Sequence, residues 1–190
     1  NKEGNYTTVM KWDSYPARQF RGITYGMKSH SFTPFISLPK STASSMELAV
    51  SDSSAPKQCL RSYGWIISDA MRAAQDPWSF QEYLMGSKAE FSISKHGYVA
   101  ANTGWFSDRS AAYLALGRPV LLQETGYSSF IETGNGLLSF NTPGEALAGI
   151  ESINAGYEKH CEAARDVAQT YFSHRKILNH LIEHTLCKVY

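Results

Sequence analysis

The sequence has no excess of charge of one sign and no long apolar run. Its 18 Lys and Arg residues face 17 Asp and Glu residues, which leaves a formal net charge of +1. Because this balance creates no field that attracts nucleic acid, we exclude a nucleic-acid partner. No apolar run approaches the roughly 20 residues that cross a bilayer, and no signal-peptide pattern opens the chain. We therefore expect a cytoplasmic protein without a transmembrane segment.

Several patterns that carry chemistry are also missing. The cysteines Cys59, Cys161 and Cys187 are far apart and form no C-x-x-C pair, which favours free thiols in a reducing compartment. The chain has no P-loop, no H-E-x-x-H, no G-x-S-x-G and no zinc-like Cys/His spacing. It also lacks Asp-x-Asp, the pair with which many sugar transferases hold a divalent ion. We therefore predict no metal site and no cofactor.

Short apolar runs alternate with capped helical patterns along the chain. With 190 residues, of which 43% are hydrophobic, the chain suits one compact domain over residues 1–190. The alternation predicts an α/β, Rossmann-like fold with a parallel sheet of about six strands, helices on both faces and long C-terminal helices. Strands are predicted at residues 7–12, 46–50, 64–68, 90–94, 118–123 and 136–140, and helices at residues 55–62, 76–86, 107–116, 142–170 and 173–190.

The most informative stretch is residues 102–110, Asn-Thr-Gly-Trp-Phe-Ser-Asp-Arg-Ser, which enters the helix predicted from Ser107. The partial positive charge and free N–H groups of a helix N-terminus suit a diphosphate. Ser107 and Ser110 offer hydroxyl groups, and Arg109 offers a guanidinium group. An alternative is that Ser107 or Asp108 only caps the helix while Arg109 lies on a solvated face. The pattern alone favours neither interpretation.

A family resemblance adds to this pattern. Residues 103–107, followed by Leu-Gly-Arg-Pro-Val at 116–120, resemble the nucleotide-sugar signature of GT-B glycosyltransferases, and the similarity extends roughly over residues 64–183. The resemblance implies the C-terminal, donor-binding half of such an enzyme, with an N-terminal acceptor-binding half in the parent chain. It implies diphosphate contacts from Gly104, Ser107, Asp108, Arg109, Ser110 and Lys28, and donor-sugar contacts from Glu124, Thr125 and Gly126.

The function expected from this resemblance is transfer of a glycosyl group from a nucleoside-diphosphate sugar to an acceptor. The nucleotide sugar is then a substrate, and the missing half supplies the general base. A nucleotide-sugar epimerase of the same fold and a non-catalytic binding module remain alternatives. An apolar stripe at helical spacing near the C-terminus is expected to pack against the missing half and to be exposed without it. The stripe consists of Phe172, Ile177, Leu178, Leu181 and Ile182.

Overall fold

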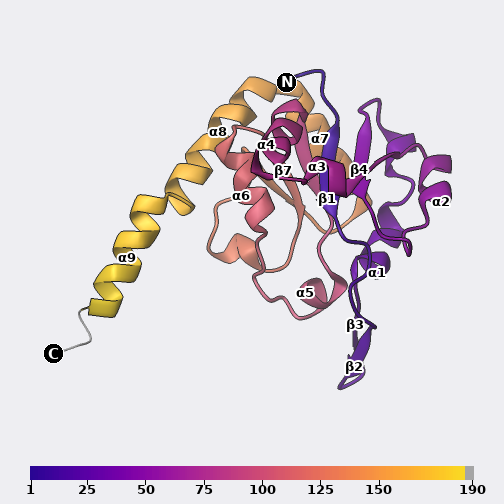
Figure 1. Ribbon diagram of the computed structural model, residues 1–190, viewed down its shortest axis with the longest axis horizontal. Coiled ribbons are helices and arrows are strands. Elements are labelled where there is room, and N and C mark those ends of the chain that lie inside the picture. The colour runs from indigo at the N-terminus through magenta and orange to yellow at the C-terminus, as the bar shows by residue number, and fades with distance from the viewer. Residues whose placement is uncertain (187–190) are drawn as a thin grey trace.

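A six-stranded parallel sheet forms the centre of the molecule. The computed structural model describes residues 1–186 and places the strands in the order β5-β4-β1-β6-β7-β8, with each neighbouring pair parallel (Figure 1). This arrangement confirms the predicted fold class. The strands, whose boundaries fall close to the predicted ones, are β1 (Tyr6–Met10), β4 (Met46–Val50), β5 (Ile66–Ser68), β6 (Ala89–Ser92), β7 (Val120–Gln123) and β8 (Leu137–Phe140).

Each face of the sheet has its own apolar core. In β7, Leu121 belongs to the core that also contains α7 (Pro143–Ala155). Val120 and Leu122 belong to a second core with residues of α6 (Asp108–Ala115) and α8 (Tyr157–Tyr171). Because successive side chains of a strand point to opposite faces, both cores draw on the same apolar run. The predicted cover of helices on both faces is therefore confirmed.

The structure also contains short elements that the sequence patterns did not predict. A separate antiparallel hairpin of β2 (Arg18–Phe20) and β3 (Ile23–Tyr25) extends from the body (Figure 1). Lys28, expected in a loop, is the first residue of helix α1. These segments are too short to show a helical or alternating period. The other helices are α1 (Lys28–Phe32), α2 (Lys57–Ser62), α3 (Ala70–Ala73), α4 (Pro77–Gly86), α5 (His96–Ala100) and α9 (His174–Leu186), with 3-10 turns at Thr33–Phe35, Leu38–Ser41 and Tyr127–Ser129.

The helical stretch predicted over residues 142–170 is two helices. Helix α7 ends at Ala155 and α8 begins at Tyr157; between them lies Gly156, whose backbone has φ −128° and ψ 44°. Glycine is among the poorest helix formers, so it favours this break. At the other end, Thr142 and Glu145 form the predicted capping box, in which each side chain accepts a bond from the other residue's backbone N–H.

Removing this cap has a measurable expected effect. Thr142→Ala is expected to lower the free energy of unfolding by about 1 kcal/mol, because the backbone N–H of Glu145 loses its acceptor. Urea denaturation monitored by circular dichroism measures the change. Thr170→Ala, an exposed substitution within α8, is the control and is expected to cause no loss. Equal stability of the wild type and Thr142→Ala would contradict the role of the cap.

Helix α9 projects from the end of α8, away from the sheet (Figure 1). Its residues Ile177, Leu178, Leu181 and Ile182 are about half exposed, as predicted for the apolar stripe. Phe172 differs, because its ring stacks on Phe106 at 5.0 Å and packs against the core. Packing of the stripe against a second domain stays a prediction. None of the helices within residues 1–186 is both long and apolar enough to cross a membrane.

Candidate functional site

Strands β1 and β6 separate toward their carboxyl ends. They pair only at Tyr6 with Ala89 and at Thr7 with Glu90. The chain builds the sheet outward from β1 through β4 and β5, then crosses to β6 and continues through β7 and β8 on the other side. The order therefore reverses between β1 and β6, and the crevice at such a switch point is where open α/β sheets bind their ligands.

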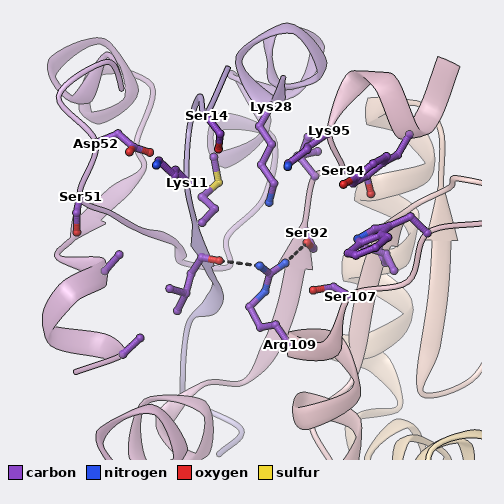
Figure 2. A pocket seen from close by; sticks show the side chains of 18 of the residues that line it. Lys11, Ser14, Lys28, Ser51, Asp52, Ser92, Ser94, Lys95, Ser107 and Arg109 are labelled. Atoms are coloured by element: carbon purple, nitrogen blue, oxygen red, sulfur yellow. Dashed lines mark hydrogen bonds between the residues drawn. The ribbon is translucent and has the colours of Figure 1, made fainter. Parts of the chain in front are cut away.

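A cleft of about 630 Å³ opens at this point (Figure 2). Its walls come from the carboxyl ends of four strands, with Met10 at the end of β1, Ser51 after β4, Ser94 after β6 and Leu122 in β7. Ser107, directly before α6, contributes a further wall. The cleft is therefore large enough for a nucleotide-sized ligand and lies where the topology predicts one.

The guanidinium group of Arg109 fills the gap between the separating strands. Its Nη1 donates to the carbonyl oxygen of Val9 at 2.7 Å, and its Nη2 donates to Ser92 Oγ at 2.6 Å (Figure 2). Its Nε donates to Glu90 Oε1 at 2.6 Å. Arg109 thus connects β1 and β6 where the two strands do not pair. It lines the cleft, which rules out the alternative that it lies on a solvated face.

Glu90 holds this arginine as a buried ion pair. Its side chain is 0% exposed, and its Oε2 has no hydrogen-bond partner among the described residues. Burial alone would lower the pKa of Arg109, but attraction and hydrogen bonding to Glu90 raise it. Arg109 therefore carries its positive charge at the floor of the cleft at every physiological pH.

Lys28 approaches the same floor from the opposite side. Figure 2 shows the Lys28 and Arg109 side chains pointing toward one another from α1 and α6. Lys28 is only 9% exposed, and no residue within 1–186 forms an ion pair or hydrogen bond with its Nζ. Burial, followed by repulsion from Arg109, lowers the pKa of Lys28 to about 7. A buried, unpaired cation facing a second cation is a costly arrangement unless an anion joins them.

Further charges surround this pair. Lys11 and Lys95 also line the cleft, and Asp52 is the acidic lining residue. The Asp52 carboxylate accepts a hydrogen bond from the backbone N–H of Trp12. The lining cations therefore outnumber the lining carboxylates, and the cleft favours an anionic ligand. Residues 1–186 contain no cluster of three or more His, Cys, Asp or Glu side chains that could hold a metal ion.

The N-terminus of α6 is only partly free. Ser107 precedes the helix and lines the cleft, with its Oγ 3.4 Å from Asp108 Oδ1. The exposed Asp108 carboxylate accepts the backbone N–H of Arg109 at 2.8 Å, so that donor already has a partner. Ser110 is fully buried, is not part of the cleft wall and has no partner for its Oγ among the described residues. Of these residues, Ser107 and Arg109 thus face the cleft.

The predicted sugar contacts lie in a turn outside the cleft lining. Glu124 Oε1 accepts the backbone N–H groups of Thr125 at 3.0 Å and Gly126 at 2.6 Å, and Oε2 accepts Ser139 Oγ at 2.7 Å. Burial would raise the pKa of Glu124, but the bonds from Ser139 and Gly126 outweigh it and lower the pKa. The carboxylate of Glu124 is therefore engaged in shaping this turn.

Thr125 and Gly104 connect the turn to the loop before α6. The backbone N–H of Gly104 donates to the Thr125 carbonyl oxygen at 2.7 Å, and Thr125 Oγ1 donates to the Trp105 carbonyl oxygen at 2.7 Å. Gly104 has φ +73°, and a Cβ there would lie 3.0 Å from the ring of Phe130. A glycine is therefore required by this local packing, and these residues position the loop that carries Trp105.

A comparison with solved structures finds a protein of similar architecture. The crystal structure of TarM, a glycosyltransferase, matches 95% of the chain with a TM-score of 0.59 and 12% sequence identity. The chain therefore shares its α/β fold with the matching part of this glycosyltransferase. The chain spans about 35% of the length of TarM. No family model and no curated protein matches the sequence, so the likeness is one of fold.

Proposed function

We propose that the cleft binds the diphosphate of a nucleoside-diphosphate sugar and that the domain serves glycosyl transfer. One observation carries this proposal: Lys28 is buried without a partner and points at Arg109 across the crevice at the switch point. A diphosphate between them would supply the counter-charge and the hydrogen-bond acceptors that Lys28 lacks, next to an arginine that Glu90 already pairs. The glycosyltransferase fold supports the same reaction class.

The chemical role of the cleft follows from its charges. When the glycosyl bond breaks, negative charge develops on the departing diphosphate. The Lys28 ammonium and the Arg109 guanidinium, fixed in advance by packing and by Glu90, would stabilise that charge without reorganisation. We further propose that side chains supply this charge without a divalent ion. A second domain of the parent protein would supply the general base and the binding site for the acceptor.

The test is donor binding as a function of pH, with UDP-glucose and GDP-mannose as probes. Their phosphates keep constant charge near neutral pH, so any pH dependence belongs to the protein. Lys28→Met is expected to lower the affinity for these probes about 10- to 100-fold at pH 7, since a charged hydrogen bond is lost. Wild-type affinity is expected to fall as the pH rises above about 7, because Lys28 then loses its proton in the free protein.

Calorimetry measures both effects. Lys159→Met, which removes an exposed lysine of α8, is the matched control and is expected to bind as the wild type does. In Lys28→Met the decline in affinity above pH 7 is expected to disappear. If the wild type binds neither probe, or if Lys28→Met keeps the wild-type affinity and pH profile, the diphosphate site is not in this cleft.

A further inference from the structure

Two aromatic rings form a shelf at one side of the cleft. Tyr98 of α5 and Trp105 of the loop before α6 stack with centroids 5.0 Å apart and an interplanar angle of 25°. Both line the cleft, and Trp105 is 50% exposed. Since Tyr98 covers one face of the indole ring, the exposed surface leaves Trp105 open to a ligand. We call this pair the aromatic shelf.

Hydrogen bonds hold the backbone that carries the shelf. The Trp105 carbonyl oxygen accepts Thr125 Oγ1 at 2.7 Å, and the Trp105 backbone N–H donates to Thr103 Oγ1 at 3.3 Å. The neighbouring Gly104 N–H is bonded to the Thr125 carbonyl oxygen. On the other side, Lys95 Nζ lies 5.5 Å from the centre of the Tyr98 ring. The bonded loop backbone and the stacking on Tyr98 reduce the freedom of the Trp105 side chain, which lowers the entropy that a ligand stacking on it would cost.

The lining residues of the cleft lie on two sides of the central pair of cations. In Figure 2, Lys28 and Arg109 lie in the middle of the cleft, Ser51 and Asp52 on one side, and Ser94, Lys95 and Ser107 on the other. The first side is completed by the small or flexible apolar chains Ala70, Met71 and Ala74 of α3 and the residue that follows it. A linear ligand with a central diphosphate would place its two ends on these opposite sides.

We infer that the aromatic shelf binds a pyranose ring. The C–H groups on one face of a pyranose are apolar and match the negative face of an indole ring, while the hydroxyl groups at its edge need polar partners. Ser107 Oγ, whose only contact to Asp108 is long, and the Lys95 ammonium group line the cleft and offer such partners. This inference rests on the proposed function only for the source of the ring, which is the donor sugar or a saccharide acceptor.

Saturation-transfer NMR on the wild type and Trp105→Ala tests the shelf. The probes are UDP-glucose, GDP-mannose, the two nucleoside diphosphates alone, and maltotriose as a free saccharide. Trp105→Ala is expected to weaken a sugar-bearing probe about five- to tenfold and to leave the bare diphosphate unchanged. In the wild type, the hydrogens on one face of the pyranose should receive the strongest saturation, and Trp105→Phe should retain most of the binding. Trp78→Ala, which removes a 75% exposed tryptophan of α4 outside the cleft, is the control.

The outcomes separate the two proposals. If Trp105→Ala weakens nucleotide-sugar binding and leaves the affinity for the bare diphosphate unchanged, the shelf is a donor subsite. If it weakens maltotriose binding alone, the shelf is an acceptor subsite. Equal weakening of the nucleotide sugar and its diphosphate would overturn the inference in favour of a nucleobase, and equal binding by wild type and Trp105→Ala of every probe that binds would overturn it outright. Failure of the wild type to bind any nucleotide probe counts against the proposed function, and the maltotriose measurement then decides the shelf by itself.

Discussion

Lys28→Met is expected to stabilise the ligand-free protein, with the largest gain at pH 7 and below. The pKa of Lys28 is 10.5 in an exposed setting and about 7 in the folded protein, where burial and then Arg109 disfavour the charged form. Below pH 7 the folded state therefore bears the full cost of a buried, unpaired ammonium group. As the pH rises from about 7 toward 10.5, the unfolded chain still binds the proton that the folded chain has released, so this cost decreases.

The size of this effect follows from the pKa difference. The gap in stability between Lys28→Met and the wild type is expected to narrow by about 1.4 kcal/mol for each pH unit between about 7 and 9. Urea denaturation of both proteins across this range measures it, with Lys159→Met as an exposed control whose gap stays constant. Parallel curves for the wild type and Lys28→Met would refute the assignment. A substitution that raises the stability of the fold and lowers the affinity for the donor is expected at a residue whose role is ligand binding.

Glu90→Ala is expected to be the most destabilising change at the site, at about 3–5 kcal/mol. The carboxylate is completely buried, and its removal leaves the largely buried Arg109 guanidinium group without a counter-charge. Urea denaturation gives the free energy of unfolding. The double variant Glu90→Ala/Arg109→Met is expected to regain part of this loss, because no unpaired charge remains.

The exposed pair of Lys2 and Glu158, 3.4 Å apart, provides the contrast. Glu158→Ala is expected to change stability little, since water solvates both groups whether or not they meet. The result that would refute this account is a double variant at Glu90 and Arg109 whose loss equals or exceeds the sum of the two single losses. Such additivity would mean that the two side chains act independently of one another.

The sequence was sufficient to predict the sheet because its strands are buried apolar runs. Residues 46–50 were predicted as a strand, and the structure gives β4 the same limits. The hairpin of β2 and β3 escaped prediction because most of its residues are exposed and its strands are three residues long. The helix break at Gly156 escaped it because the apolar period continues from α7 into α8. Local patterns thus fix the existence of long elements better than their ends.

The site was predictable in part. Ser107 and Arg109 were selected from their places at a predicted helix N-terminus and Lys28 from the family resemblance, and the structure brings all three to one cleft. The direction of Arg109 depends on the gap between β1 and β6, which only long-range pairing creates. The engagement of Glu124 depends on Ser139, which lies in the next strand. Lys11 and Lys95 were not selected, although each lies just beyond the end of its strand, where a charged side chain meets the crevice.

The central position of β1 affects how the chain can fold during synthesis. Within this sheet β1 is made first, yet Tyr6 pairs with Met46 on one side and with Ala89 on the other. Its apolar side chains and its free edge therefore stay unprotected until β6 has been made. Such non-local pairing slows folding, and exposed strand edges promote aggregation. A nascent chain that stalls between β4 and β6 would thus expose the unpaired backbone N–H and C=O groups of β1 to chaperones or to another copy of itself.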